Sequence, residues 1–391
     1  MIYLDHAATT PLRPEVLDAM LPYLRGDYGN ASSLHGLGRR ARVAVDQAHE
    51  AVARVVGCEP GEVVFTSGGT EADNAALVGV LTAPEMRASG RTGLLTSRTE
   101  HEAIRRCAER MERGGHRVAW LDPTPDGAVD PEAVSEALSA TEGVGLVSTM
   151  AVNNVVGAVT DVVAVAAVAH AHGVLAHTDA VQAAGLRSVR LDDLGVDLLS
   201  LSAHKVGGPK GVGALVVRGG TPFQPLVVGG SQERGRRGGT ENVAALVGFA
   251  HALSLADAEC EATAARVRSL QRRLRTHLTD ALGDRLRFNT SASEVASAAH
   301  ILSVSVPPGP REALDGDLLV MSLDLDGVAV SVGSACSSGA LEPSPVLLAM
   351  GIDRSTASAT VRFSLGRTTT EADVDAGAAS FVRVVRRLLA G

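Results

Sequence analysis

Short apolar runs and amphipathic helical stretches follow one another along this chain. Over residues 37–56 the apolar residues recur at the spacing of one helix face, and Gly57 follows where helices commonly end on a glycine. We therefore predict a helix over residues 37–56.

Between residues 62 and 217, predicted strands alternate with predicted helices. The strands are short runs rich in apolar residues, at 62–67, 93–97, 117–121, 145–150, 173–179, 197–202 and 213–217. The helices are expected to begin at Thr70, at His101, near Pro131 and at Asp161. This alternation implies right-handed crossovers and a mostly parallel sheet with helices on both faces. The sequence thus predicts an α/β fold.

The C-terminal part has a different pattern. A helical stretch over residues 241–282 precedes predicted strands at 301–306, 327–332 and 360–365, a helix around 314–325 and a final helix. We expect a large domain over residues 1–260 and a smaller α+β domain over residues 261–391. The pattern leaves open whether the N-terminal segment packs with the smaller domain.

Composition limits the classes of function. The 391 residues carry a net charge of −8, with 45% hydrophobic and 20% charged residues, which is typical of a globular chain and excludes disorder as its main state. The acidic balance argues against a protein that coats nucleic acid. No apolar stretch approaches the roughly 18 residues of a membrane span. Asp5 lies where the apolar core of a signal peptide would run. We expect a cytoplasmic protein without direct contact to nucleic acid or membrane.

The four cysteines are isolated from one another. Cys58, Cys107, Cys260 and Cys336 form no CxxC pair that could hold a metal or exchange disulfides, and we expect no metal site. The first three lie in predicted helices or at helix ends, where cysteine is usually an inert packing residue.

A glycine turn follows the strand predicted at 62–67. It comprises Ser67, Gly68, Gly69, Thr70 and Glu71 and opens a helix, whose free N–H groups favour an anion such as a phosphate. The alternative is a plain turn with Thr70 as the helix N-cap. The turn matches neither GxGxxG nor GxxxxGK[ST], so the usual signals of dinucleotide and ATP binding are missing.

Two further strand ends carry candidate chemistry, and ligands of open α/β sheets bind beyond such ends. One strand ends at Asp179, followed by Gln182, and the next runs into Ser202, His204 and Lys205. Alone, Asp179 could be a helix cap and Lys205 a solvated surface lysine. Together with a phosphate site, however, an Asp and a Lys with a lowered pKa on one sheet edge are what pyridoxal phosphate (PLP) requires.

Motifs along essentially the whole chain resemble those of the NifS/IscS-type cysteine desulfurases, in the class V aminotransferase branch of the PLP fold-type I enzymes. The matching segments are YLDHAATTP (3–11), GNASSLH (29–35), FTSGGTEADN (65–74), TEHEAI (99–104), NN (153–154), HTDAVQ (177–182), SLSAHKVGGPKGVGAL (200–215), RRGGTENVA (236–244), GSACSSGALEPS (333–344) and VRFSLGR (361–367). The resemblance implies the fold-type I architecture, a large domain with a mostly parallel sheet and a smaller α+β domain.

The resemblance also implies how PLP is bound. Lys205 would form the Schiff base, Asp179 would pair with the pyridine nitrogen, and His101 would stack on the ring and assist proton transfer. Gln182 would bond the phenolic oxygen. The phosphate would be held by the Gly69 turn with Thr70, Ser202 and His204, and by Thr240 of the other subunit of a homodimer.

For the substrate, the resemblance implies that L-cysteine is converted to L-alanine. Asn154 and Arg362 would bind the carboxylate, and Cys336 would take the sulfur as a persulfide and pass it to an acceptor protein, such as an iron–sulfur scaffold or a thiolation enzyme. On their own, His101 could be a surface residue at a helix start, and Arg362 an edge-strand charge. The cluster of Arg234, Arg236 and Arg237 would by default be solvated.

The chain departs from the family pattern at one position beside these residues. Val155 follows Asn154 where a Glu is usual, and this change would alter the pocket wall. The segment around Thr240 is closer to NifS than to housekeeping IscS, whereas the Cys336 segment matches the group I form. Two alternative functions stay open: a class V aminotransferase or PLP lyase with another substrate, and a catalytically silent scaffold of the same fold.

Overall fold

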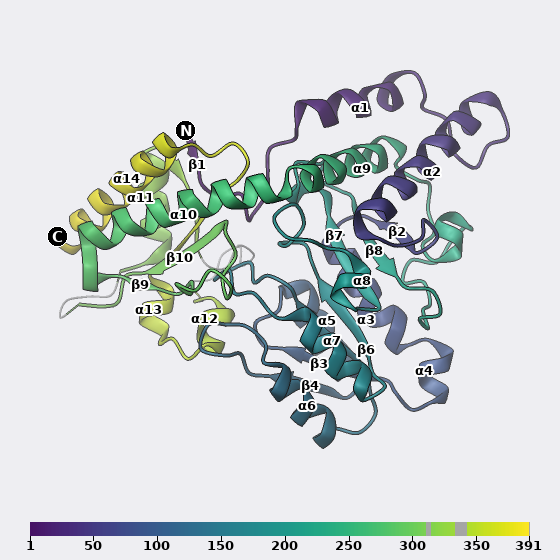
Figure 1. Ribbon diagram of the computed structural model, residues 1–391, viewed down its shortest axis with the longest axis horizontal. Coiled ribbons are helices and arrows are strands. Elements are labelled where there is room, and N and C mark those ends of the chain that lie inside the picture. The colour runs from purple at the N-terminus through teal and green to yellow at the C-terminus, as the bar shows by residue number, and fades with distance from the viewer. Residues whose placement is uncertain (310–313, 333–341, 391) are drawn as a thin grey trace.

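A computed structural model describes residues 1–309, 314–332 and 342–390 of the chain (Figure 1). Its main sheet has seven strands in the order β2-β8-β7-β6-β5-β3-β4. Their bounds are β2 Val63–Thr66, β3 Gly93–Ser97, β4 Val118–Leu121, β5 Val144–Met150, β6 Leu175–Asp179, β7 Leu198–Ser202 and β8 Gly213–Val217. Only β8 runs antiparallel to its neighbours in this sheet. The predicted mostly parallel sheet is therefore confirmed, and each predicted strand matches an observed one.

Helices cover both faces of this sheet because successive strand residues point to opposite sides. Val63 and Phe65 of β2 pack into one core, and Val64 packs into the other. The first core contains α2 Gly36–Val56, α6 Pro131–Ala140, α7 Val162–Ala171 and α9 Val243–Ala258; the second contains α3 Gly69–Leu81, α4 Pro84–Ala88 and α5 Glu102–Arg113. Two further helices of this part are α1 Pro14–Arg25, beside α9, and the short α8 Leu191–Leu194.

The helix predicted over residues 37–56 is confirmed as α2. It ends at Gly57, which has φ 70° and ψ 50°, a left-handed conformation that glycine adopts without strain. At the other end, Nδ1 of His35 accepts a hydrogen bond from the Gly38 N–H.

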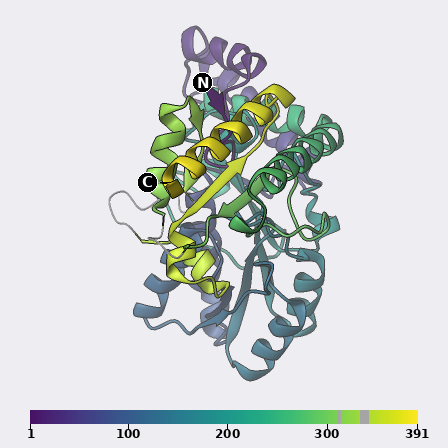
Figure 2. The same cartoon turned by 90° about the vertical axis from the view of Figure 1, so that its left-hand side faces the viewer.

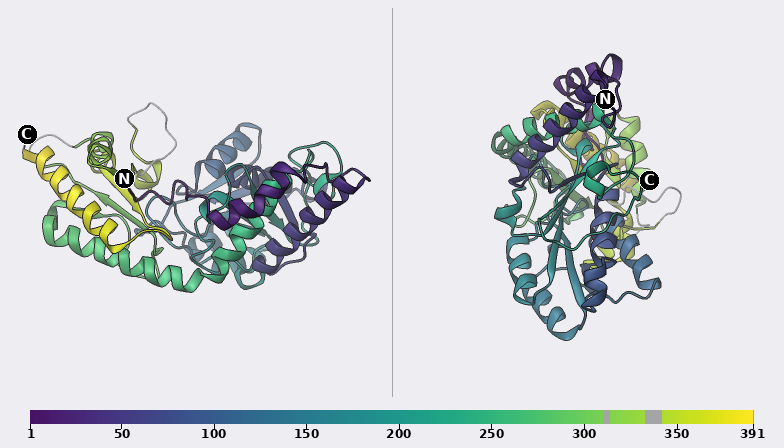
Figure 3. Two further views of the ribbon diagram at one scale, coloured as in Figure 1. Left: turned by 90° about the horizontal axis from the view of Figure 1, so that it is seen from above. Right: turned by 90° about the vertical axis from the view of Figure 1, so that its right-hand side faces the viewer.

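The predicted helical stretch over residues 241–282 is two helices. The chain bends by 69° between α9 and α10 Cys260–Leu282, and α10 runs along the C-terminal part (Figure 3). Within the described part of the chain no single helix meets the length and hydropathy expected of a membrane span; α9 and α10 meet them only as this bent pair.

The C-terminal part is a four-stranded sheet in the order β12-β13-β10-β9, packed with α10, α11 and α14 (Figure 2). Its elements are β9 Arg287–Phe288, β10 Ile301–Ser305, β12 Ser331–Val332, β13 Thr360–Ser364, α11 Gly316–Leu325, α12 Pro345–Ala349, α13 Arg354–Ser358 and α14 Glu371–Ala390. This sheet has its own apolar core, which includes Phe363 and Phe381. The division into domains at residue 260 stays a prediction that the separate core supports.

The strand predicted at 327–332 is two short strands in two sheets. β11 Val328–Ala329 pairs in parallel with β1 Ile2–Tyr3, whereas β12 pairs with β13. The start of the chain therefore lies against the C-terminal part, and Figure 1 shows both termini on that side of the molecule.

Candidate active site

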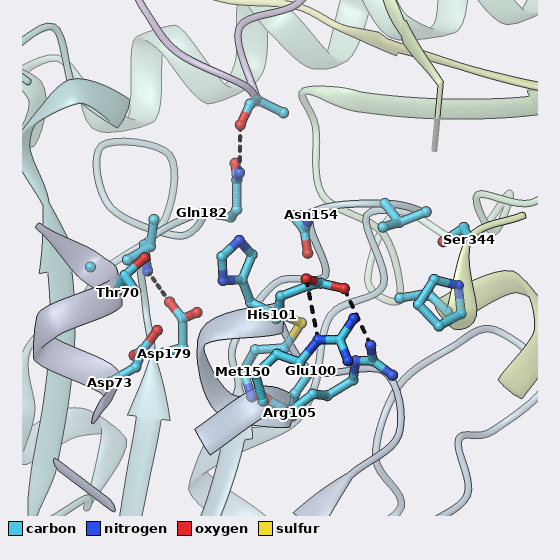
Figure 4. A pocket seen from close by; sticks show the side chains of 18 of the residues that line it. Thr70, Asp73, Glu100, His101, Arg105, Met150, Asn154, Asp179, Gln182 and Ser344 are labelled. Atoms are coloured by element: carbon cyan, nitrogen blue, oxygen red, sulfur yellow. Dashed lines mark hydrogen bonds and ion pairs between the residues drawn. The ribbon is translucent and has the colours of Figure 1, made fainter. Parts of the chain in front are cut away.

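A cavity of about 810 Å³ opens where β5, β6 and β7 end. Its walls are completed by the starts of α3 and α5, by the turn at Ala7 and Ala8, and by Arg362 and residues 342–346 of the C-terminal part (Figure 4). It brings together these sequence-predicted residues: Gly69, Thr70, His101, Asn154, Asp179, Gln182, Ser202, His204, Lys205 and Arg362.

The glycine turn opens α3 directly. The residue before the helix is Gly68, with φ 153°, and none of the described side chains caps the helix, so the alternative that makes Thr70 the N-cap is wrong. A Cβ on Gly69 would come within 2.9 Å of Val181, which leaves only glycine room there. The first N–H groups of α3 are thus presented at the cavity, as an anion would require.

Ser202 lies opposite this turn at the end of β7. Its side chain is buried, and Oγ has no hydrogen-bond partner among the described residues, although Ser202 lines the cavity. A buried hydroxyl without a partner is costly, so a ligand oxygen at this place would be favourable. His204 completes this wall, and burial lowers its pKa to about 4, which keeps the ring neutral.

Asp179 ends β6 as a buried carboxylate. Its Oδ1 accepts a hydrogen bond of 2.9 Å from the Val181 N–H in a turn, and no helix starts there, so Asp179 is not a helix cap. Burial raises the pKa of Asp179, and the N–H of Val181 and the positive charge of Lys205 act against this rise. The carboxylate is therefore suited to hold a positively charged N–H group of a ligand.

His101 is the N-cap of α5 and is only partly exposed. Its Nδ1 accepts a hydrogen bond of 3.1 Å from the Ala103 N–H, so a neutral ring carries its proton on Nε2. Burial lowers the pKa of His101, which favours that neutral form. His101 is thus more than a surface residue at a helix start.

Lys205 follows β7 in a 3-10 turn over Ala203–Lys205 and is half-buried, so it is not the solvated lysine of the alternative interpretation. Its Nζ donates hydrogen bonds to the carbonyl oxygens of Ala7 and Ala8, the latter at 2.9 Å. Gln182 donates to the same Ala7 oxygen at 2.9 Å (Figure 4). Two side chains from different strand ends therefore converge on the turn near the N-terminus.

Arg362 reaches the cavity from the C-terminal sheet. It is 1% exposed in β13, which has neighbours on both sides, so it is not an edge-strand charge. Its Nη1 donates to the Asn154 carbonyl oxygen at 2.7 Å, and its Nη2 donates to Oδ1 of Asp5 at 2.9 Å. Asn154 and Arg362 are thus adjacent, as expected for a shared carboxylate site.

Three acidic residues of this region were not expected from the sequence. Asp5 pairs with Arg362, and Asp73 and Glu100 are buried carboxyl groups in the cavity wall near Asp179. Burial, and after it the charge of Asp179, raises the pKa of Asp73 well above its usual value. Burial has the same effect on the pKa of Glu100. The only sequence signal was that all three lie inside motifs quoted above.

Val155, the departure from the family pattern, is buried at the cavity wall. It packs with Val346 and Leu347 of α12 and with Ile352. An apolar contact between the two parts of the molecule thus stands where a carboxylate is usual.

Thr240 is exposed and does not line the cavity of its own chain. Two of the three arginines before it bond backbone oxygens: Arg234 donates to Pro60 O at 3.0 Å and Arg236 to Gly61 O at 3.3 Å. Arg237 forms a forked ion pair with Glu71 of the glycine turn, with bonds of 2.9 and 3.3 Å, so this cluster is not simply solvated.

Cys336 lies outside the described residues. The next described residues along the chain, Glu342 and Pro343, line the cavity. Burial raises the pKa of Cys58 to about 12 and that of Cys107 to about 11, so both thiols are poor nucleophiles at neutral pH. Among the described residues, no group of three His, Cys, Asp or Glu side chains is arranged to hold a metal.

Comparisons with known proteins agree on one family. The aminotransferase class-V model matches residues 2–376. Cysteine desulfurase IscS of Anaeromyxobacter sp. (strain Fw109-5) is 45% identical over 391 residues, covering 99% of this chain and 93% of that protein. A solved NifS-like protein matches with a TM-score of 0.89 at 34% identity, covering 99% of both chains. DndA from Streptomyces lividans matches with a TM-score of 0.75 at 35% identity, covering 93% of this chain and 99% of that one.

Proposed function

The chain belongs to the class-V aminotransferase family and, like its IscS and NifS relatives, is a cysteine desulfurase; on this premise we propose which residues carry each part of the reaction. The observation that carries the proposal is that Asp179, Lys205 and Arg362 line one cavity, although they come from three separate strand regions. PLP, which the family implies, supplies the electron sink for breaking bonds at the substrate Cα.

The residues present fit PLP. The buried Ser202 hydroxyl, which has no partner in the described part of the chain, and the glycine turn that opens α3 suit its phosphate, together with Thr70 and His204. The buried Asp179 carboxylate suits its pyridine nitrogen, and Gln182 suits its phenolic oxygen. Lys205 is proposed as the lysine that anchors the cofactor.

Proton movement is assigned to two groups that line the cavity. Lys205 Nζ is proposed to take the proton from the substrate Cα. His101 is proposed to donate the proton that its Nε2 carries. The hydrogen bond from the Ala103 N–H to Nδ1 supports this assignment because it fixes the tautomer of the neutral ring. Asn154 and Arg362 are proposed to hold the substrate carboxylate, and so to orient Cα toward Lys205.

Cys336 is proposed as the sulfur acceptor within the enzyme. Its thiolate attacks the substrate sulfur, the carbon–sulfur bond breaks, and a sulfur–sulfur bond forms on Cys336. L-Cysteine and the thiol become L-alanine and a persulfide, so no outside oxidant is needed. The outer sulfur of the persulfide then passes to an acceptor protein, and Cys336 returns to its thiol form.

We further propose a homodimer in which Thr240 contributes to the partner's phosphate site. Large apolar side chains are exposed on α1, on α2 and on the segment before Thr240, among them Leu24, Val43 and Val228. Several such side chains on neighbouring segments favour a protein interface. A cytoplasmic location also stays a prediction.

The test is mass spectrometry of the PLP-loaded enzyme after incubation with L-cysteine. We expect alanine to form, and the mass of one added sulfur to map to the Cys336 peptide and to disappear on reduction. Cys336→Ser should bind cysteine but release almost no alanine, because a hydroxyl is a much poorer nucleophile than a thiolate. Cys260→Ser is the matched control and should stay active. Near-normal alanine production by Cys336→Ser would contradict the assignment of Cys336.

A further inference from the structure

Arg362 is a buried cation that already has an anionic partner within the chain. Its side chain is 1% exposed, and the carboxylate of Asp5, whose side chain is 17% exposed, accepts from Nη2 at 2.9 Å. A buried charge without a partner is strongly unfavourable. Asp5 therefore serves as the counter-ion of Arg362 when no substrate carboxylate is bound.

The backbone fixes the position of Asp5. Asp5 forms a parallel bridge with Ser364, two residues beyond Arg362 on the same strand. Its carbonyl oxygen accepts from the Tyr3 hydroxyl at 3.1 Å and from the Ala8 N–H at 3.1 Å. The backbone of Asp5 is thus fixed against the strand that carries Arg362, which places the Asp5 carboxylate beside the guanidinium.

The same turn also reaches the lysine of the site. Ala7 and Ala8, two and three residues after Asp5, accept the hydrogen bonds of Lys205 Nζ. Residues 5–8 therefore fix Arg362 and Lys205 relative to each other, one through a side chain and one through carbonyl oxygens.

From this geometry we infer that Asp5 is a positioning residue that sets the affinity of the enzyme for the substrate carboxylate; the inference rests on the proposed role of Arg362. A guanidinium has five N–H groups, and Asp5 and the Asn154 carbonyl oxygen each take one in the described contacts. A substrate carboxylate can therefore bind the same guanidinium, but it must approach the negative charge of Asp5. Repulsion between the two carboxylates limits how tightly substrate and product are held.

Asp5→Asn tests the inference, because asparagine keeps an oxygen acceptor for Nη2 and removes the charge. Binding of L-alanine and of L-alaninamide to the PLP-loaded enzyme is measured by isothermal titration calorimetry. We expect the Kd for L-alanine to fall about three- to tenfold, and the Kd for L-alaninamide, which has no carboxylate, to stay within about twofold. A purely structural effect would change both affinities alike.

The matched control is Asp122→Asn. Asp122 has an exposed side chain paired with Arg98, so the same loss of charge should leave both affinities unchanged. Thermal melting is the second measurement. Without ligand, Asp5→Asn should have a lower melting temperature than the native enzyme. Saturating L-alanine should raise the melting temperature of the variant by more than that of the native enzyme, because the ligand then supplies the missing counter-ion.

An unchanged or weakened affinity of Asp5→Asn for L-alanine would overturn the inference, as would equal changes for both ligands. Arg362→Gln separates this outcome from a failure of the proposed function. If Arg362→Gln binds L-alanine as well as the native enzyme does, Arg362 does not hold the carboxylate, whatever Asp5 does.

Discussion

Lys205 and Lys210 are the only lysines in the chain, and their settings differ. Lys205 is half-buried in the cavity wall and donates to Ala7 and Ala8, whereas Lys210 is exposed. Arginine supplies every other permanent side-chain cation of the protein. Because only these two amines can form a Schiff base from a side chain, the chain offers its own matched control.

Reduction of the PLP-loaded enzyme with borohydride should therefore attach the pyridoxyl group to Lys205 alone. Lys205→Ala should abolish the adduct and turnover but keep the fold, whereas Lys210→Ala should keep the adduct and turnover. Peptide mapping checks the adduct, and circular dichroism checks the fold. A stable adduct on Lys210 in the native enzyme would refute the assignment.

The buried acids Asp73 and Glu100 predict a pH dependence of stability. Because burial raises the pKa of Glu100, the folded protein holds a proton there that the unfolded chain releases once the pH exceeds the usual value near 4.3. The contribution of Glu100 to the free energy of unfolding thus falls as the pH rises. Glu100→Gln can still accept the Met150 N–H bond without titrating.

Urea unfolding of the native enzyme and of Glu100→Gln is measured at pH 5.5 and at pH 8. The free energy of unfolding of the variant, relative to that of the native protein, should be higher at pH 8 than at pH 5.5. A difference that does not change with pH would mean that Glu100 is ionised in the folded protein.

Among the residues of the cavity, the sequence located those at the ends of strongly patterned strands. Asp179, Ser202 and Lys205 could be predicted because parallel strands end at one edge of a sheet. Asp5 could not, because its role depends on Arg362, which is far away in the sequence and joins it only through the pairing of the N-terminal segment with the C-terminal sheet. No local periodicity records such a pairing.

At the scale of elements, the segment before Thr240 contains the two non-glycine residues with positive φ in the described part of the chain, Glu233 (47°) and Arg234 (55°). Such conformations cost about 1–3 kcal/mol each and persist only where other contacts hold them. Oε2 of Glu233 accepts from the Phe65 N–H and lies 2.9 Å from Nε2 of His49. One buried carboxylate therefore ties this turn to β2 and α2.

Glu233→Ala should lower the free energy of unfolding by about 2–3 kcal/mol, because it leaves the buried Phe65 N–H without a partner. Arg234→Gly should change it little or raise it, because glycine adopts the left-handed conformation without strain. Chemical denaturation of both variants gives the comparison. Equal destabilisation by the two changes would mean that the carboxylate does not hold the turn.

The sequence predicted the regular elements better than their breaks. The pattern predicts one helical stretch over residues 241–282, but α9 is buried against the main sheet and α10 belongs to the C-terminal core, so the chain bends between them. Likewise β11 and β12 form one apolar run in the sequence and pair with different sheets. In both cases tertiary packing decides what the local pattern leaves undetermined.

At the scale of the whole molecule, the proposed homodimer predicts complementation between defective chains. In a heterodimer of Lys205→Ala and Thr240→Ala chains, one shared site carries both defects and the other carries neither. Mixed dimers, isolated with two different affinity tags, should recover about half the native activity per dimer if the sites act independently. Activity no higher than that of either parent would contradict shared sites.

The pairing of β1 with β11 has a consequence for how the enzyme is made. Ile2 pairs with Val328, which the ribosome synthesises more than three hundred residues after it. At roughly 5–20 residues per second, β1 is synthesised tens of seconds before β11 is there to pair with it. Until then Asp5 has no Arg362 to bind, and Ala7 and Ala8 are not anchored beside Lys205. The main sheet can form during translation, but the cavity gains Arg362 only after β13 has been synthesised, so chains that terminate before β13 lack this wall of the cavity and should be inactive.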